Sequence, residues 1–577
     1  MEELKYTEII RRNREYRRTA TGPKYRVLVL ANIVVLYLKE ILEYALAEAG
    51  VNAEVTLGGY DAIVQESPQA GGHDAVIVFW ELANLVDGLQ YRADMMVEER
   101  LDELLTHAAS QVDLALGNLA AASLVLFNRF TDTAFAPYGL RPGAAAQLAA
   151  RLNGHLASRA RPTLLQVDLD RILIQVGLRE ALSLRDYYSS KSLYSVAFFK
   201  AYAQQIRPGI LAACGKVKKV LVFDCDNTLW DGILGEDGME GIAMSARDAR
   251  GAPYEEVQFI AKALAHRGAI LGLCSKNNEA DVDEVERNHP DFHLRDGELV
   301  VRRVNWGNKA DNLREIAAEL NVGLDSLVFV DDSAFEVDLV RGELPEVTVF
   351  RVPENRHDYP TAFRKLARLF FNLSETAEDL RKSSMYREQQ ARRTLQREFT
   401  DLEGYLRELQ LAVEISVNDR ALVPRAAQMT QKTNQFNLTT RRYTEQDISQ
   451  FIDQGDLVVC LAVKDRFGDS GVSGLAIVRL GGAAATIDSL LMSCRILGRN
   501  LECVFVDSLL SLLRARGVER IGASYLPTHK NQQVADFYER AGFGEPRIAT
   551  EGKYYTLVLR DHQSKDIDYI SVSIRER

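Results

Sequence analysis

Two aspartates directly follow an apolar run in the middle of this 577-residue chain. The run Val220–Phe223 precedes Asp224 and Asp226, and Thr228 follows two residues later. A short apolar run with β-branched members is typical of a buried parallel strand, and ligands of open α/β sheets collect where such strands end. Two carboxylates held close together need a cation or a proton, which suggests Mg²⁺ with covalent or acid–base chemistry on an anionic group. Alone, the pair could also be two solvated aspartates at a strand end.

Three later segments carry a hydroxyl, a cation and a second pair of acids. Ser275 ends another apolar run, and Lys309 opens a predicted helix, where backbone N–H groups also favour phosphate. Asp331 and Asp332 end a third apolar run. Taken singly, Ser275 could just end a strand and Lys309 could be a solvated helix lysine. In this order the four segments resemble the motifs of the haloacid dehalogenase (HAD) superfamily, whose phosphatases use four such motifs.

The resemblance implies a division of work between the first two aspartates. Asp224 would be the nucleophile that attacks phosphorus and forms an acyl-phosphate, which splits one difficult displacement into two easier ones. Asp226 would protonate the leaving oxygen and then activate water, first as an acid and then as a base. The expected ligands of Mg²⁺ are Asp224, Asp226 through its backbone carbonyl, and one or both of Asp331 and Asp332. The residues expected to bind the phosphoryl oxygens are Thr228, Ser275 and Lys309.

Length, charge and cysteine usage indicate a cytoplasmic enzyme with several domains. A chain of 577 residues is too long for one core and should divide into about three or four domains. Its formal net charge of −11 argues against general binding of nucleic acid or of an anionic membrane. The six cysteines are scattered without a Cys-x-x-Cys pair, which favours reduced thiols. The apolar stretches are too short to span a bilayer, and we expect that the charged start does not act as a signal peptide.

The string from Asp224 to Gly238 narrows the resemblance. Its second half, Trp230–Gly238, contains three glycines and three acids, which predicts a flap or turn instead of a helix, and a minimal cap. The string is similar to the FkbH-like branch of the HAD superfamily (subfamily IIIC), found in polyketide, antibiotic and related pathways. The resemblance implies that 1,3-bisphosphoglycerate, a phosphoglyceryl donor, is dephosphorylated and that glyceryl is loaded as a thioester on an acyl carrier protein. The alternatives are a stand-alone phosphatase for a small phosphorylated metabolite and a carrier-docking scaffold.

An Arg-x-x-Gly loop lies between a predicted strand and a predicted helix, at Arg495 to Gly498. Such a loop exposes N–H donors to an anion, and it resembles the pyrophosphate loop of GNAT acyltransferases, which bind coenzyme A or a phosphopantetheine arm. Asn500 departs from the small residue usual at the sixth loop position, which argues against binding of free coenzyme A and leaves open a carrier-borne arm with one phosphate. The residues expected at the pantetheine and acyl site are Asn434, Asn437, Arg441, Cys494, Arg495, Gly498, Arg499 and Tyr538. The alternatives are that the loop only shapes a helix start and that Asn434–Arg442 is a polar turn.

A glyceryl thioester could pass through an enzyme cysteine or go straight to the carrier thiol. Cys225 lies between the two aspartates, but successive strand residues face opposite sides, so its thiol should point into the core. The acidic neighbours of Cys225 would also raise the pKa of its thiol. Cys494, beside the predicted helix start, has the more favourable electrostatics.

Strand-like and helix-like segments alternate over residues 24–205, which predicts a doubly wound parallel sheet. This part resembles the SGNH-type domains that precede some phosphatases of the same subfamily. Where that family has a serine after the first strand, this chain has Asn32, so we expect docking or substrate positioning instead of hydrolysis. The expected α/β multidomain architecture is an SGNH-like domain at 1–210, a HAD Rossmann-like domain at 211–358, a helical connecting segment at 359–402 and a GNAT-like α+β domain at 403–577.

Overall fold

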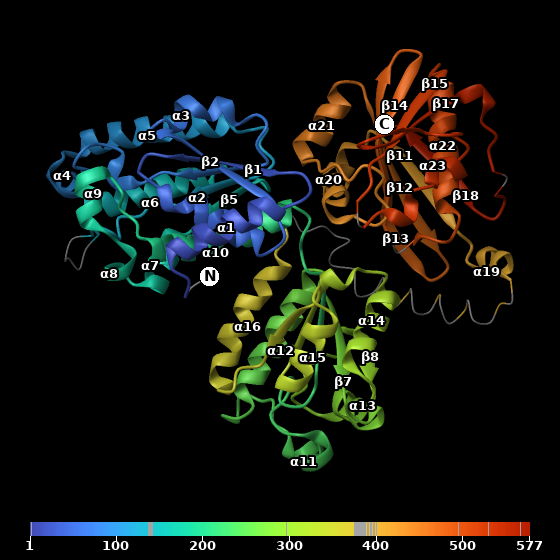
Figure 1. Ribbon diagram of the computed structural model, residues 1–577, viewed down its shortest axis with the longest axis horizontal. Coiled ribbons are helices and arrows are strands. Elements are labelled where there is room, and N and C mark those ends of the chain that lie inside the picture. The colour runs from blue at the N-terminus through green and yellow to red at the C-terminus, as the bar shows by residue number, and fades with distance from the viewer. Residues whose placement is uncertain are drawn as a thin grey trace. The chain divides into compact units, whose positions relative to one another are not determined.

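The computed structural model describes residues 1, 3–136, 142–295, 297–373, 388, 392, 395, 399, 401–493, 496–528, 530–565 and 567–576. The contacts within the chain divide it into two units, Met1–Cys214 and Gly215–Arg577. Figure 1 colours the first unit blue to green and the second green to red. No helix in the described ranges is both long and apolar enough to cross a lipid bilayer.

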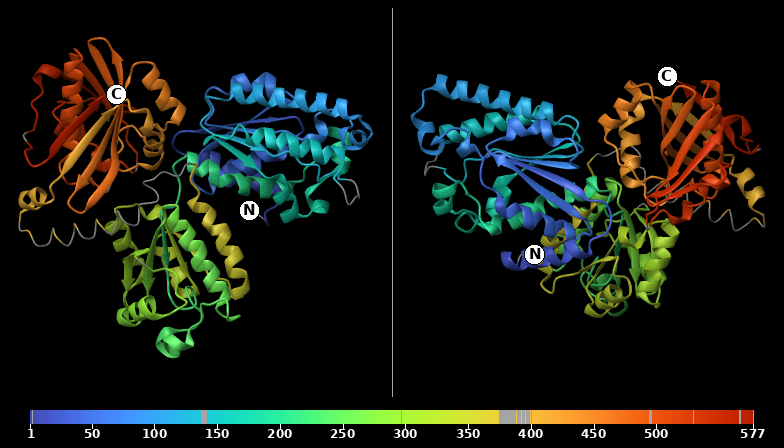
Figure 2. Two further views of the ribbon diagram at one scale, coloured as in Figure 1. Left: turned by 180° about the vertical axis from the view of Figure 1, so that it is seen from behind. Right: turned by 45° about the horizontal axis from the view of Figure 1, so that its top comes forward.

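A parallel sheet with strand order β2-β1-β3-β4-β5 forms the centre of the first unit. Its strands are β1 (Tyr25–Ala31), β2 (Ala53–Tyr60), β3 (Ala75–Phe79), β4 (Val125–Asn128) and β5 (Leu164–Val167). Its helices are α1 (Tyr6–Thr19), α2 (Leu36–Ala47), α3 (Ile63–Glu66), α4 (Leu89–Arg92), α5 (Glu98–Asn118), α6 (Ala144–Ala157), α7 (Leu169–Val176), α8 (Leu178–Ala181), α9 (Leu184–Ser190) and α10 (Val196–Ala213). Helices α3, α5 and α6 cover one face, and α1, α2, α7 and α10 cover the other (Figures 1 and 2). This is the predicted doubly wound parallel sheet, whose central strands are buried on both faces.

Asn32, at the position where SGNH-type domains carry a serine, is completely buried at the carboxyl end of β1. Its side-chain amide donates to the carbonyl of Glu81 at 2.9 Å, and its side-chain oxygen accepts from the Glu81 N–H at 2.6 Å. The Glu81 carboxylate in turn accepts a hydrogen bond from the Tyr194 hydroxyl at 2.7 Å. Asn32 therefore ties the ends of β1 and β3 together, and its amide is occupied by the backbone.

The buried carboxyl group of Glu81 predicts a pH-dependent stability. Burial raises its pKa from 4.5 to about 7, against the effect of the hydrogen bond from Tyr194. Because folding raises the pKa, the folded state holds the proton more tightly, so stability falls as pH rises from about 4.5 through 7. The variant Glu81→Gln does not have this loss. Its free energy of unfolding, taken relative to that of the wild type, should therefore increase by roughly 3 kcal/mol between pH 4.5 and pH 8. Urea unfolding of the full chain at several pH values measures the difference.

The control for this measurement is Glu103→Gln, because the Glu103 side chain is 66% exposed in a surface ion pair. We expect its stability relative to the wild type to change little with pH. A Glu81→Gln profile parallel to that of the wild type would contradict the prediction.

A second parallel sheet, with order β10-β9-β6-β7-β8, begins the second unit. Its strands are β6 (Val220–Phe223), β7 (Ile270–Ser275), β8 (Leu299–Val304), β9 (Leu327–Asp331) and β10 (Thr348–Arg351). Its helices are α11 (Leu234–Gly241), α12 (Ala252–His266), α13 (Glu279–Asn288), α14 (Lys309–Leu320), α15 (Ala334–Glu343) and α16 (Tyr359–Ala367). Successive residues of β6 face opposite sides: Leu221 and Phe223 pack in a cluster with α12 and α16, and Val220 and Val222 pack in one with α14 and α15. The sheet is therefore covered on both faces, which leaves its strand ends to carry polar side chains.

One expectation about a helix in this part was wrong. Residues 234–241 form α11 instead of a turn, with acids in the first turn where they favour a helix start. Gly238, at φ 68°, interrupts the helix. The segment predicted as a helical connection, 359–402, begins with a helix, α16, which packs on the sheet because Phe363 and Leu366 are buried there. Most of the remainder of that segment lies outside the described residues.

The rest of the second unit is a mainly antiparallel sheet with order β16-β17-β15-β14-β13-β12-β11-β18. Its strands are β11 (Ala412–Val417), β12 (Leu457–Asp465), β13 (Gly468–Gly481), β14 (Ala484–Met492), β15 (Arg520–Tyr525), β16 (Arg547–Ala549), β17 (Gly552–Val558) and β18 (Ser571–Glu576). Its helices are α19 (Leu402–Glu408), α20 (Val423–Lys432), α21 (Glu445–Asp453), α22 (Leu501–Ala515) and α23 (Phe537–Arg540). The neighbours β14 and β15 are parallel and pair only at Ala484–Thr486, after which other residues lie between them.

Candidate active site

The carboxyl ends of β6 and β9 bring two aspartates onto one lysine. Lys309 Nζ lies 3.0 Å from Asp224 Oδ1 and 2.6 Å from Asp331 Oδ2. Lys309 is the first residue of α14, whose start is capped by Asn308 through a hydrogen bond from the Ala310 N–H at 2.7 Å. The Lys309 side chain is 3% exposed and that of Asp331 is fully buried. Three residues predicted from separate segments therefore form one buried ion cluster.

The charges in this cluster do not balance. Burial alone would lower the pKa of Lys309, but the charges of Asp224 and Asp331 raise this pKa by more than burial lowers it. Lys309 therefore stays protonated. Burial and then the charge of Asp224 raise the pKa of Asp331 to about 7, although Lys309 opposes this. Burial and the same charge also raise the pKa of Asp332. The site thus holds more carboxylate than Lys309 alone can neutralise, and a further cation would relieve it.

The same carboxylates have the composition of a site for a hard divalent cation. One oxygen from each of Asp224, Asp331 and Asp332 lies within 4.8 Å of the other two. Mg²⁺ is bound in proteins by one or two carboxylates together with substrate phosphate and water. The residues present therefore fit Mg²⁺. The Asp226 carboxylate is not part of this group, which leaves its backbone carbonyl as the expected ligand.

Asp226 is held by three hydrogen bonds that the sequence did not reveal. Its Oδ1 accepts from Trp230 Nε1 and from the Leu234 N–H, both at 3.0 Å, and its Oδ2 accepts from Asn277 Nδ2 at 2.9 Å. Burial raises the pKa of Asp226, these hydrogen bonds lower it, and the charge of Asp224 raises it, with a net rise. A fixed carboxyl group with a raised pKa is suited to give and take a proton. The one available signal for Asn277 was its place two residues after Ser275.

The predicted phosphate-binding hydroxyls lie at the same end of the sheet. Ser275 ends β7 and is 1% exposed. Thr228 is fully buried, and its Oγ1 has no hydrogen-bond partner among the described residues. The chain turns at Asn227, at φ 49°, and the Thr228 carbonyl accepts from the Tyr359 hydroxyl at 3.2 Å. An unpartnered buried hydroxyl four residues after Asp224 is a group that a phosphoryl oxygen could satisfy.

Cys225 is fully buried in the apolar cluster that also holds Leu221 and Phe223. Burial and then the charge of Asp224 raise the pKa of its thiol far above the usual value. The thiolate is the reactive form of cysteine. The environment of Cys225 therefore opposes a role in carrying an acyl group.

The residues predicted at the pantetheine and acyl site have different surroundings where the structure describes them. Cys494 and Arg495 lie outside the described residues. Gly498, at φ 78°, belongs to the loop before α22. Arg499 is buried, with a pKa lowered to about 10 by burial, and pairs at 3.2 Å with Asp465. Because that guanidinium faces the domain interior, the prediction of a ligand contact from Arg499 is not supported by its position.

The remaining predicted residues of this domain mostly hold the backbone. Asn437 is fully buried, donates to the Thr433 carbonyl at 3.1 Å and accepts from the Thr440 N–H at 2.8 Å, as a polar turn requires. Arg441 pairs with Asp488. Tyr538 is packed in the core of the domain, where burial raises its pKa. Asn434 accepts a hydrogen bond from Arg442 and also lines a cavity.

The carboxylates of Asp224, Asp331 and Asp332 are called the aspartate cluster below. The fold and this cluster together are those of a HAD-like phosphatase domain, and the comparison with solved structures agrees. The chain is similar to the N-terminal part of a Bacteroides fragilis protein that contains a phosphatase domain and was crystallised with Mg, at 26% identity and a TM-score of 0.56. That similarity covers 64% of this chain and 100% of the other.

Two acetyltransferase structures match a smaller part of the chain. A GNAT-family protein from Desulfovibrio desulfuricans is 15% identical with a TM-score of 0.20, and covers 26% of this chain and 99% of its own. The ribosomal-protein-S18-alanine N-acetyltransferase of Escherichia coli is 17% identical with a TM-score of 0.20, and covers 27% and 97% respectively. No protein-family model and no curated protein matches the chain.

The ion cluster predicts a large loss of stability when its lysine is removed. Lys309→Met leaves Asp224 and Asp331 buried without a counter-charge, so we expect a loss of about 3–5 kcal/mol in the free energy of unfolding, measured by urea titration without divalent cations. The double variant Lys309→Met/Asp331→Asn should recover part of it. Lys24→Met, which breaks an exposed pair with Glu54, is the control and should lose about 1 kcal/mol or less. Equal losses in Lys309→Met and Lys24→Met would contradict the prediction.

Proposed function

We propose that this chain is an Mg²⁺-dependent FkbH-like enzyme. It removes phosphate from a phosphoglyceryl donor, 1,3-bisphosphoglycerate, and loads glyceryl as a thioester on the phosphopantetheine arm of an acyl carrier protein. The observation that carries the phosphatase part is the contact of Lys309 with both Asp224 and Asp331, beside the separately held Asp226. The donor and the carrier rest on the resemblance of residues 224–238 to the FkbH-like branch.

The placement of the two aspartates supports a dephosphorylation in two steps. An Asp224 oxygen attacks phosphorus, the bond from phosphorus to the leaving oxygen breaks, and Asp226 donates its proton to that oxygen. Asp226 then removes a proton from water, whose oxygen attacks the phosphoaspartate and releases inorganic phosphate together with the Asp224 carboxylate. The net rise in the pKa of Asp226 favours the protonated form that the first step needs.

Lys309, Thr228 and Ser275 hold the phosphoryl group. The ammonium group of Lys309 offsets negative charge on the transferring oxygens, and the hydroxyls of Thr228 and Ser275 supply neutral donors. Asp224, Asp331 and Asp332 would hold Mg²⁺. The bound ion would add positive charge next to the phosphoryl oxygens.

Thioester formation needs only the carrier thiol and the acyl-phosphate of the donor. The sulfur of the pantetheine thiol attacks the acyl carbon, the bond from carbon to the phosphate oxygen breaks, and phosphate leaves with the proton that the thiol gives up. The described cysteines near the aspartates, Cys225 and Cys274, are both buried with raised thiol pKa values. Direct transfer to the carrier thiol is therefore the simpler route.

The division of work between the aspartates predicts different products from two variants. Asp226→Asn keeps the nucleophile but removes the proton donor and base, so we expect turnover to fall by about 10²–10⁴-fold and phosphoaspartate to accumulate. Asp224→Asn should lose turnover and form no phosphoenzyme. Intact-protein mass spectrometry after mixing with Mg²⁺ and a phosphate monoester distinguishes the two. Asp311→Asn is the control, because that exposed carboxylate lies on α14 two residues after Lys309. A phosphoenzyme in Asp224→Asn would refute this assignment.

The loading reaction is tested on the carrier itself. The mass of a holo acyl carrier protein is measured after incubation with the enzyme, Mg²⁺ and 1,3-bisphosphoglycerate. With the wild-type enzyme we expect the carrier protein to gain the mass of a glyceryl group. With Asp224→Asn we expect no adduct on the carrier, or an adduct that is still phosphorylated. Phosphate release without a carrier adduct would instead identify a stand-alone phosphatase, and no reaction in either assay would favour the scaffold alternative.

A further inference from the structure

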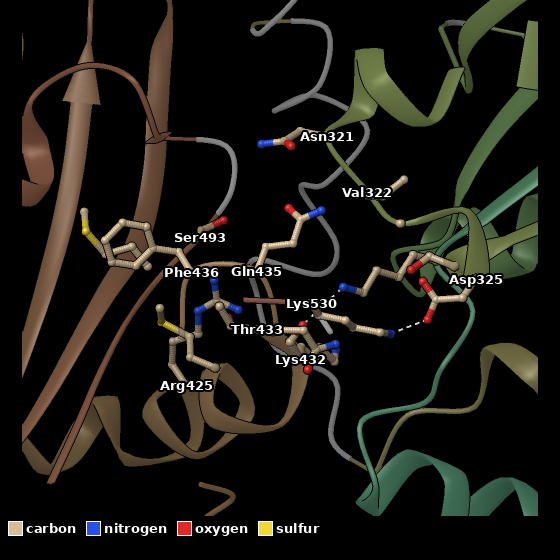
Figure 3. Close-up of a pocket in the computed structure, with 16 residues that line it drawn as sticks. Asn321, Val322, Asp325, Arg425, Lys432, Thr433, Gln435, Phe436, Ser493 and Lys530 are labelled. Carbon is tan, nitrogen blue, oxygen red and sulfur yellow. Dashed lines mark hydrogen bonds and ion pairs between the residues drawn. The ribbon is translucent and has the colours of Figure 1, made fainter. Parts of the chain in front are cut away.

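A cavity of about 320 Å³ lies within the second unit, away from the aspartate cluster (Figure 3). One wall is the loop 321–326 between α14 and β9, which is at the amino end of β9, whereas Asp331 is at its carboxyl end. The other wall comes from the end of α20, the segment 433–436 and the end of β14. A volume of this size is within the range of small-molecule sites.

The cavity gathers positive charge in a chain that is acidic as a whole. Four of the side chains that line it are cationic and one is a carboxylate, whereas the chain carries a formal net charge of −11. The cations are Lys219, Arg425, Lys432 and Lys530, and the carboxylate is Asp325. Such an excess raises the local concentration of anions.

Contacts between the two walls place these cations. Lys530 pairs with Asp325, as the dashed line in Figure 3 marks, and Lys219 Nζ donates to the Lys432 carbonyl at 3.1 Å. Burial raises the pKa of Asp325, but the hydrogen bond and charge of Lys530 lower it overall, so the pair stays ionised. The residues that would bind an anion thus come from two parts of the second unit. Lys219 belongs to the part with the parallel sheet, and Lys432 and Lys530 belong to the part with the mainly antiparallel sheet.

The remaining lining suits the organic part of a ligand. Apolar side chains of Met429, Phe436 and Met492 lie with the amides of Asn434 and Gln435 along one wall. Figure 3 shows Phe436 and Ser493 on the side of the β14 strand end. Apolar surface with a few amide groups matches a flexible chain that contains amides of its own.

The backbone of β14 beside the cavity is already paired by the chain itself. The Met492 N–H donates to the Phe436 carbonyl at 3.0 Å, and the Leu438 N–H donates to the Leu490 carbonyl at 3.1 Å. On the other side the Leu526 N–H donates to the Leu438 carbonyl at 2.8 Å. Residues 436–438 therefore fill the gap between β14 and the end of β15 like a short strand. A ligand arm cannot pair with these backbone groups and must lie against side chains instead.

We propose that this cavity binds an organic phosphate whose non-phosphate part is a flexible, amide-containing chain. The phosphate lies among Lys219, Lys432 and Lys530, and the chain lies along Phe436 and Met492. The assignment deepens the proposed function, on which it rests for the carrier-borne arm, because a phosphopantetheine group has this chemistry.

The test is isothermal calorimetry of the full chain with 4′-phosphopantetheine in EDTA. Pantetheine, which lacks the phosphate, is the second probe. We expect the phosphorylated probe to bind at least 10-fold more tightly than pantetheine, and Lys432→Gln to weaken its binding at least fivefold. Lys464→Gln, whose side chain is 63% exposed on β12, is the matched control and should bind as the wild type does. Lys530→Gln is a second cavity variant, and thermal unfolding of each variant verifies its fold.

Equal affinities for the two probes would overturn the proposal, because they would show no recognition of phosphate. Unchanged affinity in both cavity variants would also overturn the proposal, because the probe would then lie elsewhere. The absence of any binding of the phosphorylated probe would overturn it as well. Since EDTA removes the metal that dephosphorylation needs, failure here leaves the phosphatase assignment to its own assays. Conversely, a chain without phosphatase activity could still show the expected binding.

Discussion

The contact of Lys309 with Asp224 and Asp331 is the constraint on which the rest of the phosphatase domain depends. A lysine and two carboxylates taken out of water are each expensive to bury, and their attraction offsets that cost only when all three are held together. The parallel sheet meets the requirement because β6 and β9 are neighbours and end at the same edge. The cap at Asn308 fixes the start of α14 and with it the position of the lysine.

The same constraint explains why two aspartates separated by one residue have different surroundings. Asp224 lies in the ion cluster, and Asp226 is removed from it by hydrogen bonds from Trp230, Asn277 and the Leu234 backbone. Cys225 between them packs into the apolar cluster. Alternation along the extended chain sends Cys225 to the side opposite the two aspartates, and the hydrogen bonds to Asp226 are what separate its carboxyl group from that of Asp224.

Much of this arrangement could be predicted from the sequence because buried parallel strands are short apolar runs with polar residues at their ends. Val220–Phe223 and the run before Asp331 are strands in the structure, and Lys309 begins a helix. The hydrogen bond from Asn277 to Asp226 could not be predicted, because it joins residues 51 positions apart. Nor could the inward turn of Arg499, since its partner Asp465 belongs to a distant strand. The helix α11 was missed because its glycines suggested a turn, whereas a helix of eight residues tolerates Gly238 as an interruption.

Helix α14 also sets the relation between the aspartate cluster and the cavity. It begins at Lys309 and is followed at once by Asn321, which lines the cavity, so the two sites lie at opposite ends of the same helix. Its twelve residues correspond to about 18 Å at 1.5 Å per residue. Strand β9 gives the same result, because Asp331 ends it and the loop 321–326 precedes it. A phosphate held among the cavity cations is therefore out of reach of Asp224 and is not the one removed. In the proposed reaction the cavity must hold a phosphate that is retained, while the free end of its flexible arm does the chemistry.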